Sequence, residues 1–157
     1  MRPIYLLALL SICSTSGFAQ SHASSRDAVR MEDEKLLAYR SAVAPYVTKA
    51  RATYPAAKKR FLAGLPPGHI FAVMVRLQSL DHAKKEVQQA DVFVEVHAIK
   101  NGNIYGRINS PMPIAGHKRG DLISFPESEI INWVIQRPDG SEEGNAVGKF
   151  LDHYKPK

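Results

Sequence analysis

The sequence predicts an α+β fold in which an N-terminal helical arm packs on a curved antiparallel sheet of five to six strands. Apolar residues recur every three or four positions before residue 64 and at every second position in several later segments. Asn101 and Gly102 separate two of those segments, and this pair is a strong hairpin signal because both residues tolerate positive φ. Helices followed by hairpin-linked strands favour α+β over alternating α/β folds. A partly closed barrel is an alternative form of the same sheet.

Length and composition favour a single folded domain. The chain has 157 residues, 45% of them hydrophobic and 23% charged, which is typical of one globular unit. We expect the helical arm at 27–64 and the sheet domain at 65–154. The formal net charge is +6, and much of the excess positive charge lies in the arm. This charge permits an anionic partner, whereas a solvated helix face is the alternative explanation.

Residues 1–19 have the pattern of a secretory signal peptide. Arg2 precedes an apolar run at 4–12, and the small residues Gly17 and Ala19 stand three positions and one position before a cut after Ala19. The run is shorter than the about 20 residues that a membrane-spanning helix needs. We therefore expect cleavage after Ala19, with a cut after Ala23 as the alternative.

Cleavage at this site has three consequences for the mature chain. Residues 20–26 would form a flexible leader, and the only cysteine, Cys13, would be lost with the signal. A chain without thiols suits an oxidising compartment. The sequence therefore predicts a periplasmic or secreted protein with no transmembrane segment after cleavage.

Two helical segments are expected in the arm. Pro45 should kink the first one, or end it near Val43 and begin a new helix with itself in the first turn. A further helix should start near Pro55 and end before Gly64, which suits the left-handed position after a helix. The apolar residues that share one face of the first segment are Leu36, Tyr39, Val43, Tyr46 and Ala50.

The strand predictions rest on β-branched and aromatic residues in alternating patterns. Residues 78–90 lack a clear apolar period, so we expect a long surface connection there. Gly106 lies inside one strand and indicates a bulge or a bend. Trp133, the only Trp, is expected in the core, with an exposed binding role as the alternative. The expected strands are 70–77, 92–99, 104–109, 122–125, 130–136 and a last one at 147–154, and the core partners expected for Trp133 are Phe93 and Phe125.

Several short motifs follow one another along residues 51–151. They are Ala-Arg-Ala-Thr at 50–53, Val-Phe-Val at 92–94, Ile-x-Gly at 104–106, Asn-x-Pro at 109–111, Gly-Asp at 120–121, Ile-x-Asn-Trp at 130–133 and Gly-x-x-x-Gly spacing between 140 and 148. In this order the motifs resemble the YegJ-like family of uncharacterised bacterial proteins (domain of unknown function 2314). The resemblance implies one such domain over 27–154 and carries no activity, catalytic residue or cofactor.

One motif departs from the family pattern. Many members have Asp where this chain has Asn132. If that Asp performs chemistry, the departure removes it. If it only caps a turn, Asn serves equally well, because both side chains make the same turn contacts.

The sequence contains no strong catalytic or metal-binding motif. None of the serines lies in a Gly-x-Ser-x-Gly elbow, and no two histidines have the spacing of a helical metal site. A metal site could still assemble across strands from His69, His97 and Asp121, but scattered surface histidines are the more ordinary explanation. We expect no metal, no cofactor and no catalytic residue.

The loop at 116–121 and the strand before it carry the residues that we expect to bind a partner. Lys118 and Arg119 could grip an anion while Asp121 orients Arg119. The alternative is that Asp121 only caps the loop. The candidate binding residues are Arg107, Asn109, His117, Lys118, Arg119 and Asp121.

These observations favour a small non-enzymatic binding module of the cell envelope. Its expected partner is another envelope protein or an anionic polymer, and the sequence shows no groove-reading motif for nucleic acid. The alternative is a small hydrolase. A pocket that gathers His117, Asp121 and a Ser or Glu would favour the hydrolase, whereas a convex surface without pockets would favour binding.

Overall fold

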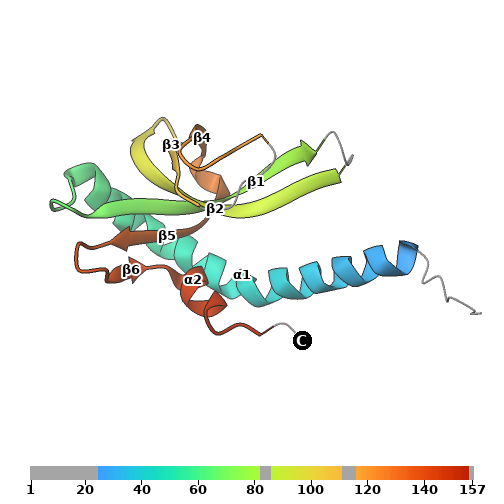
Figure 1. Cartoon of the computed structure of the whole chain (residues 1–157). Coiled ribbons are helices and arrows are strands. Elements are labelled where there is room, and N and C mark those ends of the chain that lie inside the picture. Colours follow the sequence, from blue (N-terminus) through green and yellow to red (C-terminus); the bar gives the residue numbers. More distant parts are fainter. Residues whose placement is uncertain (1–24, 82–85, 111–115, 156–157) are drawn as a thin grey trace, which may run out of the picture.

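The computed structural model describes the backbone of residues 25–81, 86–110 and 116–155 and the side chains of residues 35–78, 89–110 and 116–155. The predicted signal peptide and most of the predicted leader lie outside these residues. One long helix, α1 (Ser25–Ala63), runs beside a six-stranded antiparallel sheet (Figure 1). A single 3-10 turn, η1 (Glu127–Glu129), and a short helix, α2 (Ala146–Leu151), complete the described elements. The predicted α+β fold is confirmed.

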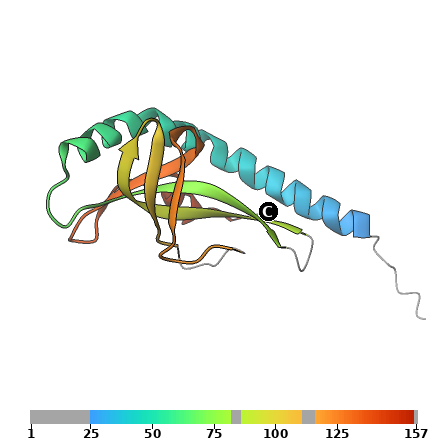
Figure 2. The same cartoon turned by 90° about the horizontal axis from the view of Figure 1, so that it is seen from above.

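The sheet has the strand order β4-β3-β2-β1-β5-β6, and every pairing is antiparallel. Figure 2 shows the strands twisting across the long helix. Within the described residues β4 and β6 form the two edges, so the sheet is curved but open and the barrel alternative is wrong. The strands are β1 (Ile70–Asp81), β2 (Glu86–Lys100), β3 (Asn103–Ile108), β4 (Leu122–Pro126), β5 (Ile130–Gln136) and β6 (Glu142–Gly144).

Helix α1 continues through both of its prolines, so the helix end near Val43, one of the two alternatives at Pro45, is wrong, and so is the separate helix expected from Pro55. A proline inside a helix removes one backbone hydrogen bond and disfavours the turn before it. Here Val43 and Val47, on either side of Pro45, both pack against the sheet, and this packing holds the helix together. Helix α1 ends where expected, at Gly64, whose φ of +94° closes the last turn with a hydrogen bond from its N–H to Phe61 O.

The predicted surface connection at 78–90 is also wrong. Strands β1 and β2 stay paired from Ala72–Glu95 out to Asp81–Glu86, and the ribbon that they form extends beyond the other strands (Figure 1). The backbone ladder of an antiparallel pair needs no apolar face, so a polar segment can be a strand without showing an apolar period. The sequence pattern identified only the buried part of this hairpin.

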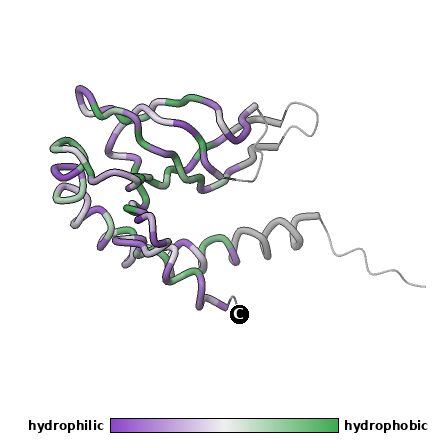
Figure 3. Tube along the Cα trace, turned by 60° about the vertical axis from the view of Figure 1, so that its left-hand side comes forward, coloured by the Kyte–Doolittle hydropathy of each residue, from purple (hydrophilic) through white to green (hydrophobic). Residues whose placement is uncertain are grey.

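Two clusters of buried residues lie on opposite faces of the sheet. Alternation along β1 directs Val73 and Val75 to one face and Met74 to the other. Figure 3 shows where hydrophobic and hydrophilic residues lie along the chain trace. The first core comprises Ala50, Tyr54, Ala57, Phe71, Val73, Val75, Val92, Val94, Val96, Ile104, Phe125, Ile130, Trp133 and Ile135, and the second comprises Val43, Met74, Ile131 and Val147.

Helix α1 contributes to both cores and therefore crosses the sheet at the edge of β5. Its residues up to Val47 pack on the second core, and those from Ala50 onward pack on the first. At the crossing, Arg51 Nε donates a 2.7 Å hydrogen bond to Ile130 O, at the start of β5. A register shift between β1 and β5 at this point skips Ile131, so Ile130 pairs with Val75 and lies with it in the first core, while Ile131 packs on the second. The helix thus takes the place of a neighbouring strand along this part of β5.

Gly106 lies opposite a bulge in β2, as its position inside a strand predicts. The register between β2 and β3 shifts between Val96 and Ala98, directly across from Gly106. A Cβ atom on Gly106 would lie 2.3 Å from Glu95 O, so only glycine fits. The bulge also turns Ile99 toward the first core, where simple alternation would place Ala98.

The predicted last strand at 147–154 is instead α2, and the sixth strand is β6. Asn145 has a φ of +54°, and its side-chain oxygen accepts a hydrogen bond from Gly148 N, which starts the helix. Val147, Phe150 and Leu151 then stand at helical spacing and pack on the second core. The same spacing in the sequence was compatible with a helix, but the segment was too short for its period to be decisive.

Trp133 and Phe125 are both buried in the first core. Phe93 packs against the second core instead, because alternation along β2 directs it away from Val92 and Val94. The expected contact between Phe93 and Trp133 therefore does not form.

Candidate functional site

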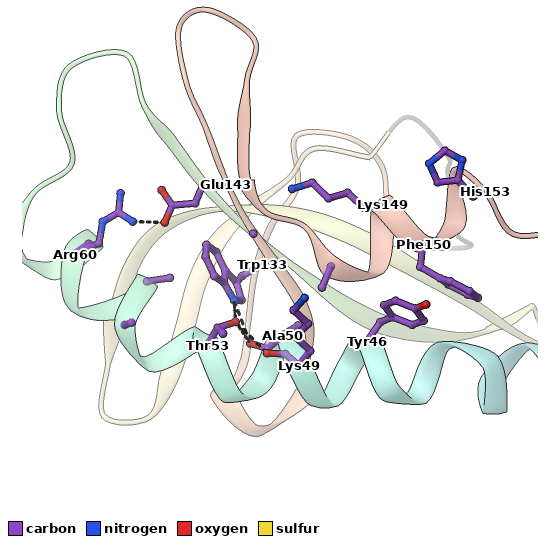
Figure 4. A pocket seen from close by; sticks show the side chains of 14 residues that line it. Tyr46, Lys49, Ala50, Thr53, Arg60, Trp133, Glu143, Lys149, Phe150 and His153 are labelled. Atoms are coloured by element: carbon purple, nitrogen blue, oxygen red, sulfur yellow. Dashed lines mark hydrogen bonds and ion pairs between the residues drawn. The ribbon is translucent and has the colours of Figure 1, made fainter.

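A pocket of about 660 Å³ lies between α1, the β5–β6 hairpin and α2 (Figure 4). Its volume is in the range of sites that hold small molecules. The aromatic, apolar and small residues that line it are Tyr46, Ala50, Ala56, Ala57, Trp133, Gly144, Ala146 and Phe150. The polar residues that line it are Lys49, Thr53, Arg60, Glu143, Lys149 and His153.

The indole of Trp133 is fixed at the base of this pocket. Its Nε1 donates to Ala50 O and to Thr53 Oγ1, both at 3.0 Å. Only 6% of the residue is exposed, so a buried N–H without these acceptors would be costly. These bonds tie strand β5 to helix α1 and hold the ring in one orientation.

Gly144 allows β6 to approach the indole closely. Its φ is +81°, and a Cβ atom there would lie 2.7 Å from two carbons of the Trp133 ring. The backbone then returns to β5, where Asn145 N donates to Trp133 O at 2.7 Å. The glycine therefore shapes one wall of the pocket and sets where α2 begins.

One end of the pocket is closed by an ion pair between Arg60 on α1 and Glu143 on β6 (Figure 4). Arg137 Nη2 lies 3.3 Å from the other oxygen of the same carboxylate. The hydrogen bond from Arg60 is the main reason that the pKa of the Glu143 carboxyl is lowered from its ordinary value. Among the described residues, Glu143 is the only acidic one that lines the pocket, and two arginines already balance its charge.

The opposite end of the pocket is formed by aromatic rings. Tyr46 on α1 and Phe150 on α2 stack with their centroids 4.3 Å apart and their planes at 20°. Tyr154 packs on the far side of Phe150 at 5.1 Å. His153 lines the pocket beside this pair, and its side chain is exposed.

Two lysines lie between these ends. Lys49 extends from α1 and Lys149 from α2, and Figure 4 shows both amino groups directed into the space beside Trp133. Within the described part of the chain, neither ammonium group has a carboxylate in ion-pair distance. The pocket therefore combines an apolar lining with an unbalanced positive charge.

The pocket does not present an activated nucleophile. In the part of the lining that the structure describes, Thr53 and Tyr46 are the only residues with a hydroxyl group. The Thr53 hydroxyl bonds to Lys49 O at 3.0 Å and accepts the Trp133 N–H, so it is committed to structural contacts. A nucleophile for covalent catalysis needs a base within hydrogen-bond reach, and no such base adjoins Thr53 among the described contacts.

The loop residues predicted to bind a partner come together where β3 ends and β4 begins. Arg107 Nη1 donates to Gly120 O at 2.9 Å, and Arg119 Nη2 donates to Asn109 Oδ1 at 3.0 Å. Both guanidinium groups therefore bind within the loop. Residues 111–115, which complete it, lie outside the described residues.

Asp121 accepts a 2.9 Å hydrogen bond from the backbone N–H of Lys118 and so caps the turn. The expected contact between Asp121 and Arg119 is replaced by the bond from Arg119 to Asn109. Lys118 is exposed and His117 half-buried. Anion binding by this loop stays a prediction, and the geometry shows the capping role of Asp121 directly.

The three residues of the alternative metal site lie on separate elements. His69 precedes β1, His97 is the bulge residue of β2 beside Glu95, and Asp121 caps the distant loop. In the parts of the chain described here, no group of three His, Cys, Asp or Glu side chains is placed to hold a metal ion.

The sequence alone did not identify the pocket. Lys49 and Arg60 belong to the basic face of the arm, for which a solvated surface was the alternative explanation. Lys149 fell in a segment predicted as a strand, so nothing placed it opposite Lys49. The available signal was the row of small residues Ala50, Ala56 and Ala57, which leaves space along one face of α1.

Two further observations bear on what the chain is. None of the described helices is long and apolar enough to cross a membrane. Comparison with protein-family models found no match, and comparisons with curated proteins and with solved structures found none either.

Proposed function

We propose that this chain is a small non-enzymatic binding module that holds a small anionic molecule in the pocket between α1, β5–β6 and α2. One observation carries this proposal: Lys49 and Lys149 face a common apolar space whose single carboxylate is already paired with Arg60 and Arg137. An anion that entered this space would balance the lysines without displacing an existing ion pair. Electrostatic complementarity of this kind selects ligands by charge.

The shape of the pocket supports a small molecule over a large partner. The Arg60–Glu143 pair closes one end and the Tyr46–Phe150 pair the other (Figure 4). Ligand sites of this type are concave and largely apolar, with a few polar groups that fix orientation. A flat interface for a folded protein partner would not need this closure.

The proposal extends to location and family. Residues 1–19 have the pattern of an export signal, so we propose that the module acts in the periplasm or outside the cell. The resemblance to the YegJ-like family supports an origin among bacterial proteins of that kind. The loop with Lys118 and Arg119 is retained as a second surface, for an envelope protein or an anionic polymer.

The alternative of a small hydrolase has less support. It required a pocket that gathers His117 and Asp121 with a Ser or Glu. The pocket is instead lined by His153 and Glu143, and Glu143 is bound to Arg60. A carboxylate held by two arginines is a poor proton acceptor, because the lowered pKa weakens its basicity.

The test is a thermal-shift screen of the chain against matched anionic, neutral and cationic small molecules. Ala56→Phe serves to fill the pocket, since Ala56 is exposed and lines it. Ala52→Phe adds the same ring to an exposed position of α1 outside the pocket and is the matched control. We expect anionic compounds to raise Tm in the wild type and in Ala52→Phe but not in Ala56→Phe. Stabilisation that survives in Ala56→Phe would contradict the proposal.

A further inference from the structure

We propose that the pocket selects a compact monocarboxylate: one carboxylate on an apolar, ring-sized body. This inference rests on the proposed function and specifies its ligand. The carboxylate would lie between Lys49 and Lys149, and the body would lie against Trp133 and the alanines of α1.

The two lysines suit the two oxygens of a carboxylate. One ammonium comes from α1 and the other from the last turn of α2, and Figure 4 shows them approaching the same space from different sides. A carboxylate can accept from both at once, and charge-assisted bonds of this kind are short and strong. Its binding would therefore join α1 to α2 across the pocket.

The lining around the lysines suits a ring-sized body. Ala56, Ala57 and Ala146 provide apolar surface without filling the space, and the Trp133 indole lies at its base. The ion pair at one end and the stacked rings at the other limit the length of the body (Figure 4). A long acyl chain would have to leave the pocket over one of these ends.

A second negative charge on the ligand would be disfavoured. Glu143 stands at the end of the pocket away from the Tyr46–Phe150 pair, and its carboxylate is kept ionised by Arg60 and Arg137. A dicarboxylate with its first group on the lysines would bring its second group toward Glu143. The two arginines at that end are already engaged by Glu143, so the second carboxylate would lie against the apolar lining without a cation of its own, and the pocket should prefer one carboxylate over two.

Isothermal titration calorimetry on the chain can test each part. The probes are 2-naphthylacetate, its neutral amide 2-naphthylacetamide, naphthalene-2,6-dicarboxylate, 2-naphthylethylamine and hexadecanoate. We expect 2-naphthylacetate to bind about tenfold or more tightly than the amide, because the amide has no charge for the lysines. The dicarboxylate and hexadecanoate should both bind more weakly than 2-naphthylacetate.

A charge-reversal variant supplies a gain of binding, which a merely unfolded protein could not show. Lys49→Glu with Lys149→Glu should bind 2-naphthylethylamine and lose 2-naphthylacetate. Lys59→Glu with Lys100→Glu changes the net charge equally at exposed lysines that do not line the pocket. That control should bind all probes as the wild type does.

The outcomes separate the two proposals. If the amide and the acid bind equally and Ala56→Phe abolishes both, the pocket binds small molecules but the carboxylate inference is wrong. Tighter binding of hexadecanoate or of the dicarboxylate than of 2-naphthylacetate would also overturn it, as would no binding of 2-naphthylacetate. The thermal-shift screen tests the pocket itself independently of these probes.

Discussion

The buried Asn132 on β5 donates a 2.8 Å hydrogen bond from its Nδ2 to Oδ1 of Asn145, the residue that starts α2. The same Asn145 oxygen accepts from Gly148 N at 3.2 Å, and its amide nitrogen donates to Glu142 Oε2 at 2.7 Å. These contacts fix the orientation of both amides. They place α2, and with it Lys149, on the β5 strand that carries Trp133.

This contact gives Asn132 a role that differs from the turn cap considered in the sequence. The residue neither caps a turn nor lies in the pocket, but uses an amide N–H inside the sheet. An Asp at this position has no such donor when ionised. The amide therefore has a structural role that a carboxylate could not take over in the same arrangement.

Asn132→Asp is expected to lower the free energy of unfolding at pH 7 by about 1–3 kcal/mol or more, because a carboxylate would face the Asn145 oxygen in a buried site. Burial raises the pKa of such a carboxyl, so stability should fall as pH rises above about 4. Urea unfolding at several pH values measures this. Asn101→Asp, an exposed turn residue, is the control and should change little. Equal stability of the two variants at pH 7 would contradict the account.

Gly106→Ala is expected to destabilise the β2–β3 pairing. The new Cβ would lie 2.3 Å from Glu95 O and 2.6 Å from a Val94 methyl group, so the strands must separate. The expected loss is about 1–3 kcal/mol, as for overpacked cores. Thermal unfolding measures it, with the exposed Ser124→Ala on β4 as the control. A variant as stable as wild type would show that the strands are less tightly paired here.

Tyr54 links α1 to η1, and this link predicts a loss of stability at alkaline pH. Its hydroxyl donates to Glu127 Oε2 at 2.9 Å, and Lys58 Nζ lies 2.7 Å from the other oxygen. Burial first, and then the bond to Glu127, raise the pKa of Tyr54 above its ordinary value of 10.0. The folded state keeps a proton that the unfolded state loses, so the contribution is complete below pH 10.0 and declines above it.

Tyr54→Phe tests this link. It should cost about 1.5–3 kcal/mol at neutral pH, because a bond to a charged group is lost, and the difference from wild type should shrink above about pH 10. Chemical unfolding across this range measures both effects, and Tyr105→Phe at an exposed position is the control. A difference that stays constant with pH would show that the phenol is not held neutral by folding.

Pro45→Ala tests the continuity of α1. Pro45 is exposed and lies inside the helix, where proline is the least favourable residue. Alanine should raise the free energy of unfolding by about 1–2 kcal/mol, after allowance for the greater freedom of the unfolded chain. Ser41→Ala, at an exposed position of the same helix, is the control for the effect of alanine's helix propensity alone. A loss of stability would favour the helix end near Val43, which the sequence left as one of two alternatives.

The sequence predicted the elements in which the local pattern of apolar residues matches the pattern of burial. Alternation identified 92–99 as a strand, a nearly continuous run of β-branched and aromatic residues identified 130–136, and Gly64 marked the end of the helix. The extension of the β1–β2 ribbon was missed because backbone pairing leaves no trace in a polar segment. The sequence left a kink and a helix end as alternatives at Pro45, because local propensity does not show that packing on two cores holds the helix together there.

The candidate site was harder to predict for a similar reason. Lys49 and Lys149 are far apart in the sequence and meet only because α1 crosses the edge of β5 and Asn145 starts α2 beside it. No sequence motif marks the crossing of α1 over the edge of β5 or the start of α2 at Asn145. The loop at 116–121 was conspicuous because its polar residues are contiguous, and the described contacts show that much of that polarity serves the loop itself.

The most direct test of the pocket as a binding site is an NMR titration of the 15N-labelled chain with 2-naphthylacetate. The chain has one Trp, so a single indole N–H signal reports on the base of the pocket. We expect the Trp133 indole and the Gly144 amide to shift to saturation while the Gly102 amide stays in place. Shifts confined to Gly116 and Gly120, with an unchanged indole signal, would contradict the account and assign binding to the loop.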